Sequence, residues 1–118
     1  MGKVIRKAIW LSFDLGVAGD YPGLYKWLDE HDAVECGDSV AFFFYSIDRE
    51  KENDIIEKVK ADLKDSVVFR PGDRLYVVYR ERTVSGCKVR GDFMLGKRKA
   101  SPWEGYGDQT NSGGEFGE

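Results

Sequence analysis

Two short stretches of the chain are apolar at every position, and they constrain the fold more than any other feature. One is Val40 to Tyr45 and the other is Leu75 to Tyr79. Both are rich in β-branched and aromatic residues, which favour strands. A strand that is apolar on both faces lies inside a sheet, because each of its faces needs a cover. We therefore expect a sheet with central strands at these two places.

The first thirty residues predict a strand followed by a helix. Lys7 to Leu15 alternates as a strand does, with Ile9, Leu11, Phe13 and Leu15 on one side and Trp10, Ser12 and Asp14 on the other. The helix is expected from Tyr21 to about Asp32, with Asp20 as N-cap and Pro22 in its first turn. Its expected core residues are Leu24 and Leu28, with Tyr21 and Tyr25 as further candidates.

The rest of the chain adds strands and one clear amphipathic helix. Ala33 to Ser46 is interpreted as a short strand, a tight turn and a longer strand, or else as one long bulged strand. Asp54 to about Lys64 places its apolar residues on one helical side: Ile55, Ile56, Val59 and Leu63. Glu81 to Gly86 is predicted as a loop and Cys87 to Leu95 as a final, weaker strand. Thr110 to Glu118 is predicted as a disordered tail.

This order of elements predicts an α+β domain of ferredoxin-like βαββαβ type with an extra C-terminal strand. We expect one domain over residues 1–100, followed by an aromatic segment and a Gly-rich acidic tail over residues 101–118. Right-handed crossovers would place both helices on one face of the antiparallel sheet and leave the other face bare.

The bare face is expected to carry Trp10 and one apolar set from each central strand. Because large apolar patches usually mark interfaces, this pattern favours a homodimer. The last strand could add to the sheet edge of the partner, or it could fold back over its own sheet.

The charge is unevenly distributed along a chain of net charge −3. Ser66 to Ala100 holds nine basic and three acidic residues. Its basic side chains could follow a phosphate backbone, or they could be a solvated rim that protects strand edges. The candidate nucleic-acid contacts are Arg74, Arg80, Arg82, Lys97, Arg98 and Lys99. Trp103 and Tyr106 could stack on bases, contact a protein partner, or pack on the protein's own core.

Several classes of site are disfavoured by the sequence. The two cysteines, Cys36 and Cys87, are far apart and form no CxxC pair, so a zinc site is not expected. They are interpreted as small core or edge residues of a protein in the reducing cytoplasm. His31 is expected to complement the dipole at the end of the first helix. No apolar run is long enough for a signal sequence or a membrane span.

The motif order then resembles a known family. A first strand that ends in Phe13-Asp14, a Ser39-Val40-Ala41-Phe42 strand, an amphipathic helix and a DxLYVVY strand resemble the CRISPR-associated Cas2 family and the related VapD-type toxins. The resemblance covers roughly Ala8 to Arg80. It implies a ferredoxin-like homodimer and involvement in CRISPR or toxin-antitoxin defence.

The resemblance also implies a role for Asp14, which falls on the family's acidic position. In the family, two copies of that acid face each other across the dimer and are proposed to hold a divalent metal. Mg²⁺ at Asp14 could activate water for phosphodiester cleavage. The alternative is that Asp14 ends its strand and caps the following turn. Asp20 is a weaker second candidate ligand.

These observations leave three functional hypotheses open. The first is a Mg²⁺-dependent nuclease centred on Asp14. The second is a non-catalytic dimeric adaptor that binds nucleic acid or a larger protein. The third, which no residue specifically favours, is a small-molecule sensor with its site between subunits.

Overall fold

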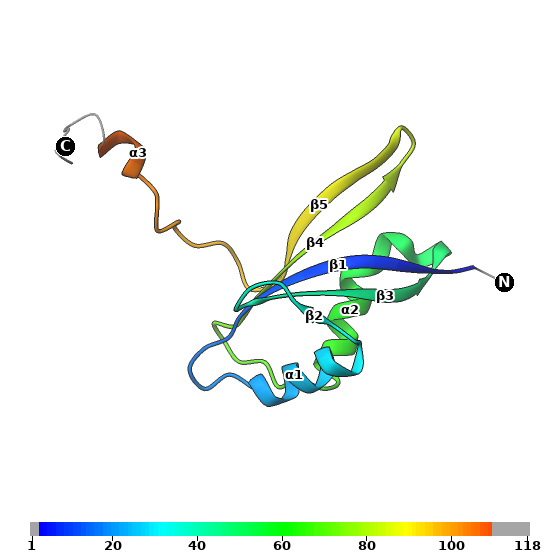
Figure 1. The fold of residues 1–118 in the computed structure, drawn as a ribbon, viewed down its shortest axis with the longest axis horizontal. Coiled ribbons are helices and arrows are strands. Elements are labelled where there is room, and N and C mark those ends of the chain that lie inside the picture. The colour runs from blue at the N-terminus through cyan, green and yellow to red at the C-terminus, as the bar shows by residue number, and fades with distance from the viewer. Residues whose placement is uncertain (1–2, 110–118) are drawn as a thin grey trace.

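The computed structural model describes residues 3–109 as an α+β fold built on a five-stranded antiparallel sheet (Figure 1). The elements in chain order are β1 (Val4–Asp14), α1 (Tyr21–Glu30), β2 (Val34–Glu35), β3 (Val40–Asp48), the 3₁₀ helix η1 (Arg49–Asp54), α2 (Ile55–Lys64), β4 (Arg74–Thr83), β5 (Gly86–Leu95) and α3 (Tyr106–Gln109). The order across the sheet is β2-β3-β1-β4-β5. The two apolar stretches therefore lie in β3 and β4, the strands that flank β1.

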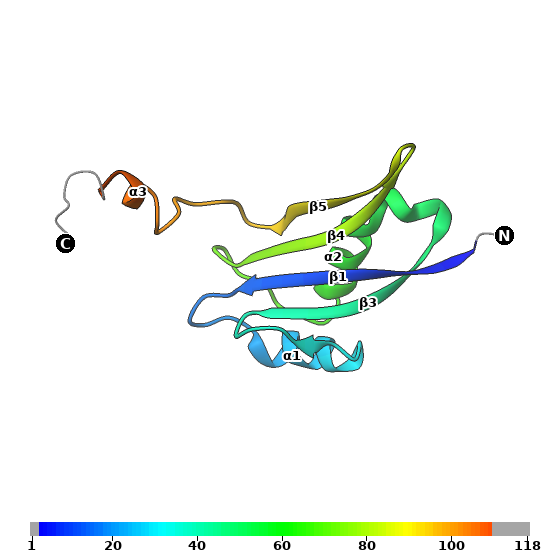
Figure 2. The ribbon, with the colours of Figure 1, turned by 45° about the horizontal axis from the view of Figure 1, so that its top comes forward.

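Both longer helices lie on the same side of the sheet, and α3 lies beyond its end (Figure 2). The core forms where α1 and α2 meet the sheet, and its largest fully buried side chains are Trp27, Phe43, Ile9, Leu11, Leu24, Ile55, Leu63 and Leu75. Burying each of them stabilises the fold by about 1.5–3 kcal/mol relative to exposure. This arrangement confirms the expected covered face of β1, and no helix of the described residues covers the opposite sheet face (Figure 2).

Helix α1 starts where the sequence predicts, because Asp20 caps it. One carboxylate oxygen accepts from the Gly23 N–H at 3.0 Å and the other from the Val68 N–H at 2.8 Å. The second bond ties the start of α1 to the chain after α2. Asp20 therefore has a structural role, and both of its oxygens are engaged.

The predicted core side of α1 needs one correction. Tyr25 is 53% exposed, whereas Trp27 is 1% exposed and packs edge-on against Phe43 with ring centroids 5.3 Å apart. Trp27 lies three residues after Leu24, so helical spacing places both on the same side. Trp27 was missed because the prediction followed only the Leu24–Leu28 pair.

The predicted loop at Glu81 to Gly86 is wrong. β4 continues to Thr83, β5 begins at Gly86, and only Val84 and Ser85 connect the two strands. Gly86 has φ +130°, a conformation that a residue with a side chain rarely adopts. Because β5 pairs with β4 of its own chain, it extends the sheet and does not fold over it.

The chain leaves the sheet after β5 and runs away from the domain (Figure 1). Trp103 is 72% and Tyr106 is 61% exposed, so neither packs on the protein's own core. We call residues 97–109 the arm. The predicted disordered tail, Thr110 to Glu118, lies outside the described residues. None of the helices within residues 3–109 has the length and apolar character needed to cross a bilayer.

Candidate functional site

The side of the sheet opposite to α1 and α2 forms the candidate site, and we call it the open face. The strand register places alternate strand residues on it, and these include Arg6, Ala8, Trp10, Ser12 and Asp14 from β1, Phe42, Phe44 and Asp48 from β3, Arg74, Tyr76, Val78, Arg80 and Arg82 from β4, and Cys87, Val89, Gly91 and Phe93 from β5. These residues combine exposed aromatic rings with arginines.

The aromatic rings lie across the middle of the open face in two groups. Trp10 and Phe42 have ring centroids 4.8 Å apart, and Phe44 follows 5.2 Å from Phe42. On the other side of β1, Tyr76 and Phe93 meet edge-on at 4.9 Å. Trp10 is 39% and Phe44 is 44% exposed, so these rings offer free surface to a flat partner.

Gly91 makes room for one of these rings. A side-chain carbon at Gly91 would collide with the hydroxyl group of Tyr76 and would press on its ring. The absence of a side chain at this position of β5 therefore lets the Tyr76 ring lie across the neighbouring strand. The sequence alone gave no reason for a glycine here.

Arginines lie against these rings and carry positive charge across the face. The Arg6 guanidinium carbon lies 4.3 Å from the centroid of the Phe44 ring. Arg98, from the start of the arm, lies 5.4 Å from the ring of Phe93 and 5.9 Å from that of Tyr76. Contacts of this kind hold a cation close to an aromatic surface.

Asp14 forms an ion pair with Arg74 from the adjacent strand. The Asp14 Oδ2 atom accepts from Arg74 Nη2 at 2.8 Å and from Nε at 3.3 Å. The register brings the two residues directly opposite each other. The Arg74 guanidinium beside this carboxylate repels a cation and therefore disfavours Mg²⁺ at Asp14. Within residues 3–109 no group of three or more His, Cys, Asp or Glu side chains could hold a metal.

Two hollows open at the arm end of the open face. One, of about 300 Å³, is lined by Ser12, Asp14, Arg74, Tyr76, Phe93 and Arg98. The next, of about 240 Å³, shares Arg74, Phe93 and Arg98 and extends along the arm to Trp103. The arm's tryptophan therefore continues the aromatic surface of the sheet.

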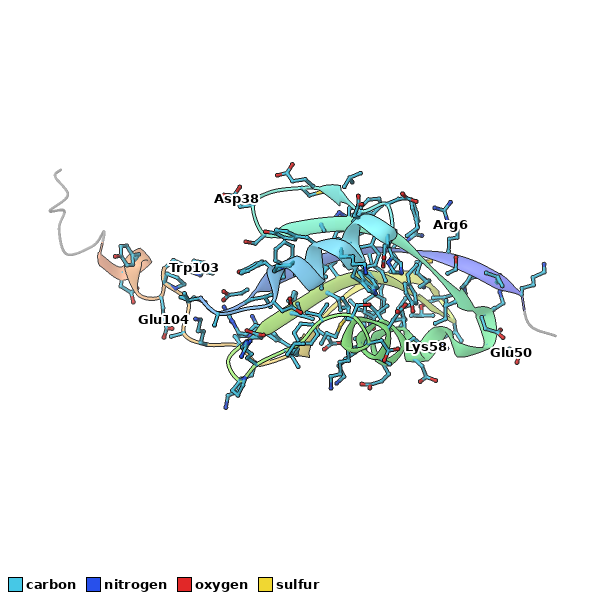
Figure 3. The ribbon with its side chains drawn as sticks, turned by 90° about the horizontal axis from the view of Figure 1, so that it is seen from below. Arg6, Asp38, Glu50, Lys58, Trp103 and Glu104 are labelled. Atoms are coloured by element: carbon cyan, nitrogen blue, oxygen red, sulfur yellow. The ribbon has the colours of Figure 1, made fainter. Side chains whose placement is uncertain are left out.

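A third hollow, of about 260 Å³, lies at the other end of the face, and we call it the notch. Its lining residues are Ile5, Arg6, Lys7, Ala8, Phe44, Arg80, Arg82 and Cys87. Arg6 and Trp103, which mark the two ends, lie far apart along the long dimension of the molecule (Figure 3). The open face thus has aromatic rings in the middle and cations at both ends.

Several titratable groups away from the open face have structural explanations. Asp73 is 3% exposed, and its carboxylate accepts from the N–H groups of Gly16 and Arg70. The predicted helix-end position of His31 is confirmed: its ring stacks on Trp27 with centroids 3.7 Å apart, and its Nε2 lies 3.8 Å from Asp62 Oδ2. Cys36 and Cys87 are both exposed, so the core interpretation is wrong. Cys87 lies on the edge strand β5, as the edge interpretation predicts, whereas Cys36 lies in the turn between β2 and β3.

Among the described residues, three side chains have pKa values that depart from their ordinary range. Burial, reinforced by a hydrogen bond to Asp62 at 2.8 Å, raises the pKa of Tyr45. Burial, followed by the charges of Asp92 and Glu81, raises the pKa of Tyr79. The N–H groups of Val68 and then Gly23 lower the pKa of Asp20. All three shifts follow from local packing or capping, and none involves the residues that form the open face.

The structure brings most of the predicted site residues together. Trp10, Arg74, Arg80 and Arg82 lie on the open face, with Arg98 against its rings, while Lys97, Lys99, Trp103 and Tyr106 belong to the arm. Arg6 was missed because a strand start at Lys7 excluded it. Comparisons of the chain with protein-family models, curated proteins and solved structures found no match.

Proposed function

We infer that the fold is ferredoxin-like. The described order of elements through β4 is βαββαβ once η1 is set aside, and the first four strands lie in the order β2-β3-β1-β4. Both support this assignment, as does the position of α1 and α2 on one face. β5 then extends the sheet beyond β4 as the extra C-terminal strand.

We propose that the chain is a nucleic-acid-binding protein whose open face takes a single strand. The observation that carries the proposal is an uncovered sheet face with five aromatic rings and arginines among them: Trp10, Phe42, Phe44, Tyr76 and Phe93. Unpaired bases stack on such rings, and arginines attract the phosphates between them. A duplex keeps its bases stacked on one another and cannot use these rings.

Charge favours nucleic acid over a second copy of this chain as the occupant. Five arginines lie on the open face or against its rings, while its strand carboxylates are Asp14, which is paired with Arg74, and Asp48, which caps η1. Two copies stacked face to face would set arginines against arginines. The homodimer that the bare face and the Cas2-like resemblance predict would bury this same face, so a second copy of the chain is the competing occupant.

The binding function does not need Asp14 as a catalytic group. Arg74 holds the carboxylate in place, which favours the adaptor hypothesis over the Mg²⁺-dependent nuclease hypothesis. In the proposed role, Asp14 orients Arg74 beside the ring of Phe93, at 6.0 Å from its centroid. Its carboxylate also offsets the positive charge of Arg74, so Asp14 lowers the attraction of the arm end of the open face for phosphate.

Fluorescence anisotropy with labelled twelve-nucleotide strands tests the proposal. We expect oligouridine and oligothymidine to bind, and a matched duplex to bind at least tenfold more weakly. Trp10→Leu and Phe44→Leu should each weaken binding by about 5- to 150-fold, since base stacking contributes about 1–3 kcal/mol. Tyr25→Leu, which removes a similarly exposed ring on the helix side, is the matched control.

Two results would contradict the proposal. One is equal binding of the duplex and the single strand, which would indicate a surface that contacts the phosphates and does not stack on the bases. The other is a Tyr25→Leu effect as large as that of Trp10→Leu. Light scattering of the same samples reports the mass: a dimer that dissociates when Trp10 is replaced would assign the open face to a second copy.

A further inference from the structure

We propose that the notch binds a terminal phosphate group, a phosphomonoester, at the end of the strand on the open face. The strand in this statement rests on the proposed function, whereas the affinity of the notch for a phosphate oxyanion stands on its own geometry. The notch uses residues of β1, β3, β4 and β5 at the end of the sheet opposite to the arm.

The notch exists because β1 and β4 separate there. Their pairing ends at Ile9 and Tyr79, and beyond this point the β4–β5 hairpin rises away from β1 (Figure 1). Lys7 fills the split: it is only 9% exposed, and its Nζ atom donates to the Arg80 carbonyl oxygen at 2.6 Å. A buried ammonium group therefore forms the floor between the two diverging strands.

The charge of the notch is one-sided. Among the described residues, its lining includes four cationic side chains, Arg6, Lys7, Arg80 and Arg82, and no acidic one. Elsewhere on the sheet arginines pair with acids across strands, as Arg74 does with Asp14 and Arg90 with Glu81. Among the described residues, Arg80 and Arg82 form no such ion pair. Arg6, Arg80 and Arg82 repel one another, so an anion that enters the notch among them is attracted to all three.

A phosphomonoester fits this site better than an internal phosphodiester. It carries up to two negative charges and three terminal oxygens, whereas a diester carries one charge and two such oxygens. Guanidinium groups donate two parallel hydrogen bonds to phosphate oxygens, and three of them surround the notch. Phe44 also lines the notch, so the terminal base could stack on its ring while the phosphate enters.

The test compares ten-nucleotide oligouridines that carry a 5′-phosphate, a 3′-phosphate or hydroxyl groups at both ends, by anisotropy with an internal label. We expect one of the two phosphorylated strands to bind about tenfold more tightly than the hydroxyl strand, the gain of one charge-assisted contact. Arg80→Gln with Arg82→Gln should remove this gain. The matched control, Lys58→Gln with Lys64→Gln on exposed α2 positions, loses the same charge and should keep it.

A thermal melt with millimolar pyrophosphate tests the notch without any strand. The melting temperature should rise for the unmodified protein and for the α2 control, and not for the Arg80/Arg82 variant. The inference is overturned if pyrophosphate stabilises all three proteins equally. It is also overturned if the strands with a 5′-phosphate and with a 3′-phosphate both bind no more tightly than the hydroxyl strand. If no oligonucleotide binds but pyrophosphate acts through Arg80 and Arg82, the proposed function fails and the oxyanion site stands.

Discussion

Replacement of Asp73 by asparagine should destabilise the protein markedly, although the two side chains have nearly the same size and shape. Asp73 is 3% exposed, and its two carboxylate oxygens accept from Gly16 N at 3.0 Å and Arg70 N at 2.9 Å. These bonds join the loop after β1 to the turn before β4. An amide side chain has one acceptor oxygen, so one of the two N–H groups would face another donor.

The expected loss in the free energy of unfolding follows from the loss of this one acceptor oxygen. Loss of one hydrogen bond to a charged acceptor costs about 1.5–3 kcal/mol, and small domains have only about 5–15 kcal/mol in total. In urea unfolding, followed by circular dichroism, the midpoint should fall by roughly 1 M. Asp29→Asn, an exposed carboxylate on α1, is the control and should stay within about 0.5 kcal/mol. A cost for Asp73→Asn no larger than that of the control would refute the reasoning.

Three further predictions concern single side chains. Tyr45→Phe should cost about 1 kcal/mol at neutral pH. The pKa of Tyr45 is raised in the folded state, so the stabilisation by its hydroxyl group is complete below about pH 10 and is lost as the pH rises further. In urea unfolding at pH 8 to 11, the free energies of unfolding of the unmodified protein and the variant should therefore converge. A difference that stays constant over this range would contradict the prediction. Asp14→Asn should strengthen single-strand binding severalfold by freeing Arg74, whereas the nuclease hypothesis predicts loss of Mg²⁺-dependent cleavage. Gly91→Ala should tilt the Tyr76 ring and weaken single-strand binding about tenfold with little change in the urea midpoint; unchanged binding would show that this ring is not used.

Much of the fold could be predicted from periodicity because the strongest patterns coincide with buried faces. The alternation in β1 and the amphipathic pattern of α2 both identified their core sides correctly. The short β2, the turn after it and the longer β3 also followed from the sequence, since Gly37 and Asp38 interrupt a strongly β-forming stretch. The α1 cap at Asp20 was predictable because it is a purely local interaction.

The extent of the β4–β5 hairpin could not be predicted in the same way. Arg80 to Thr83 is polar and carries no apolar alternation, because this part of β4 projects beyond the helices and has no core to face. A segment without a buried side gives little pattern, so it looked like a loop. The split between β1 and β4, and with it the notch, depends on that projection.

The site residues also differ in whether the sequence alone could identify them. The basic cluster and Trp10 were found from composition and alternation, but the grouping of Arg6 with Arg80 and Arg82 depends on the register between strands far apart in the sequence. The ion pair of Asp14 with Arg74 spans sixty positions and changes how Asp14 is interpreted. Cross-strand partners of this kind are not encoded in local spacing.

Ultraviolet cross-linking identifies directly which residues of the protein contact bound oligouridine. The modified peptides are found by mass spectrometry. Cross-links should fall on strand peptides that contain Trp10, Phe44 or Tyr76, and competition with unlabelled single strand should remove them. Cross-links confined to α1 and α2, under conditions where the strand is bound, would mean that the aromatic side of the sheet is not where nucleic acid lies.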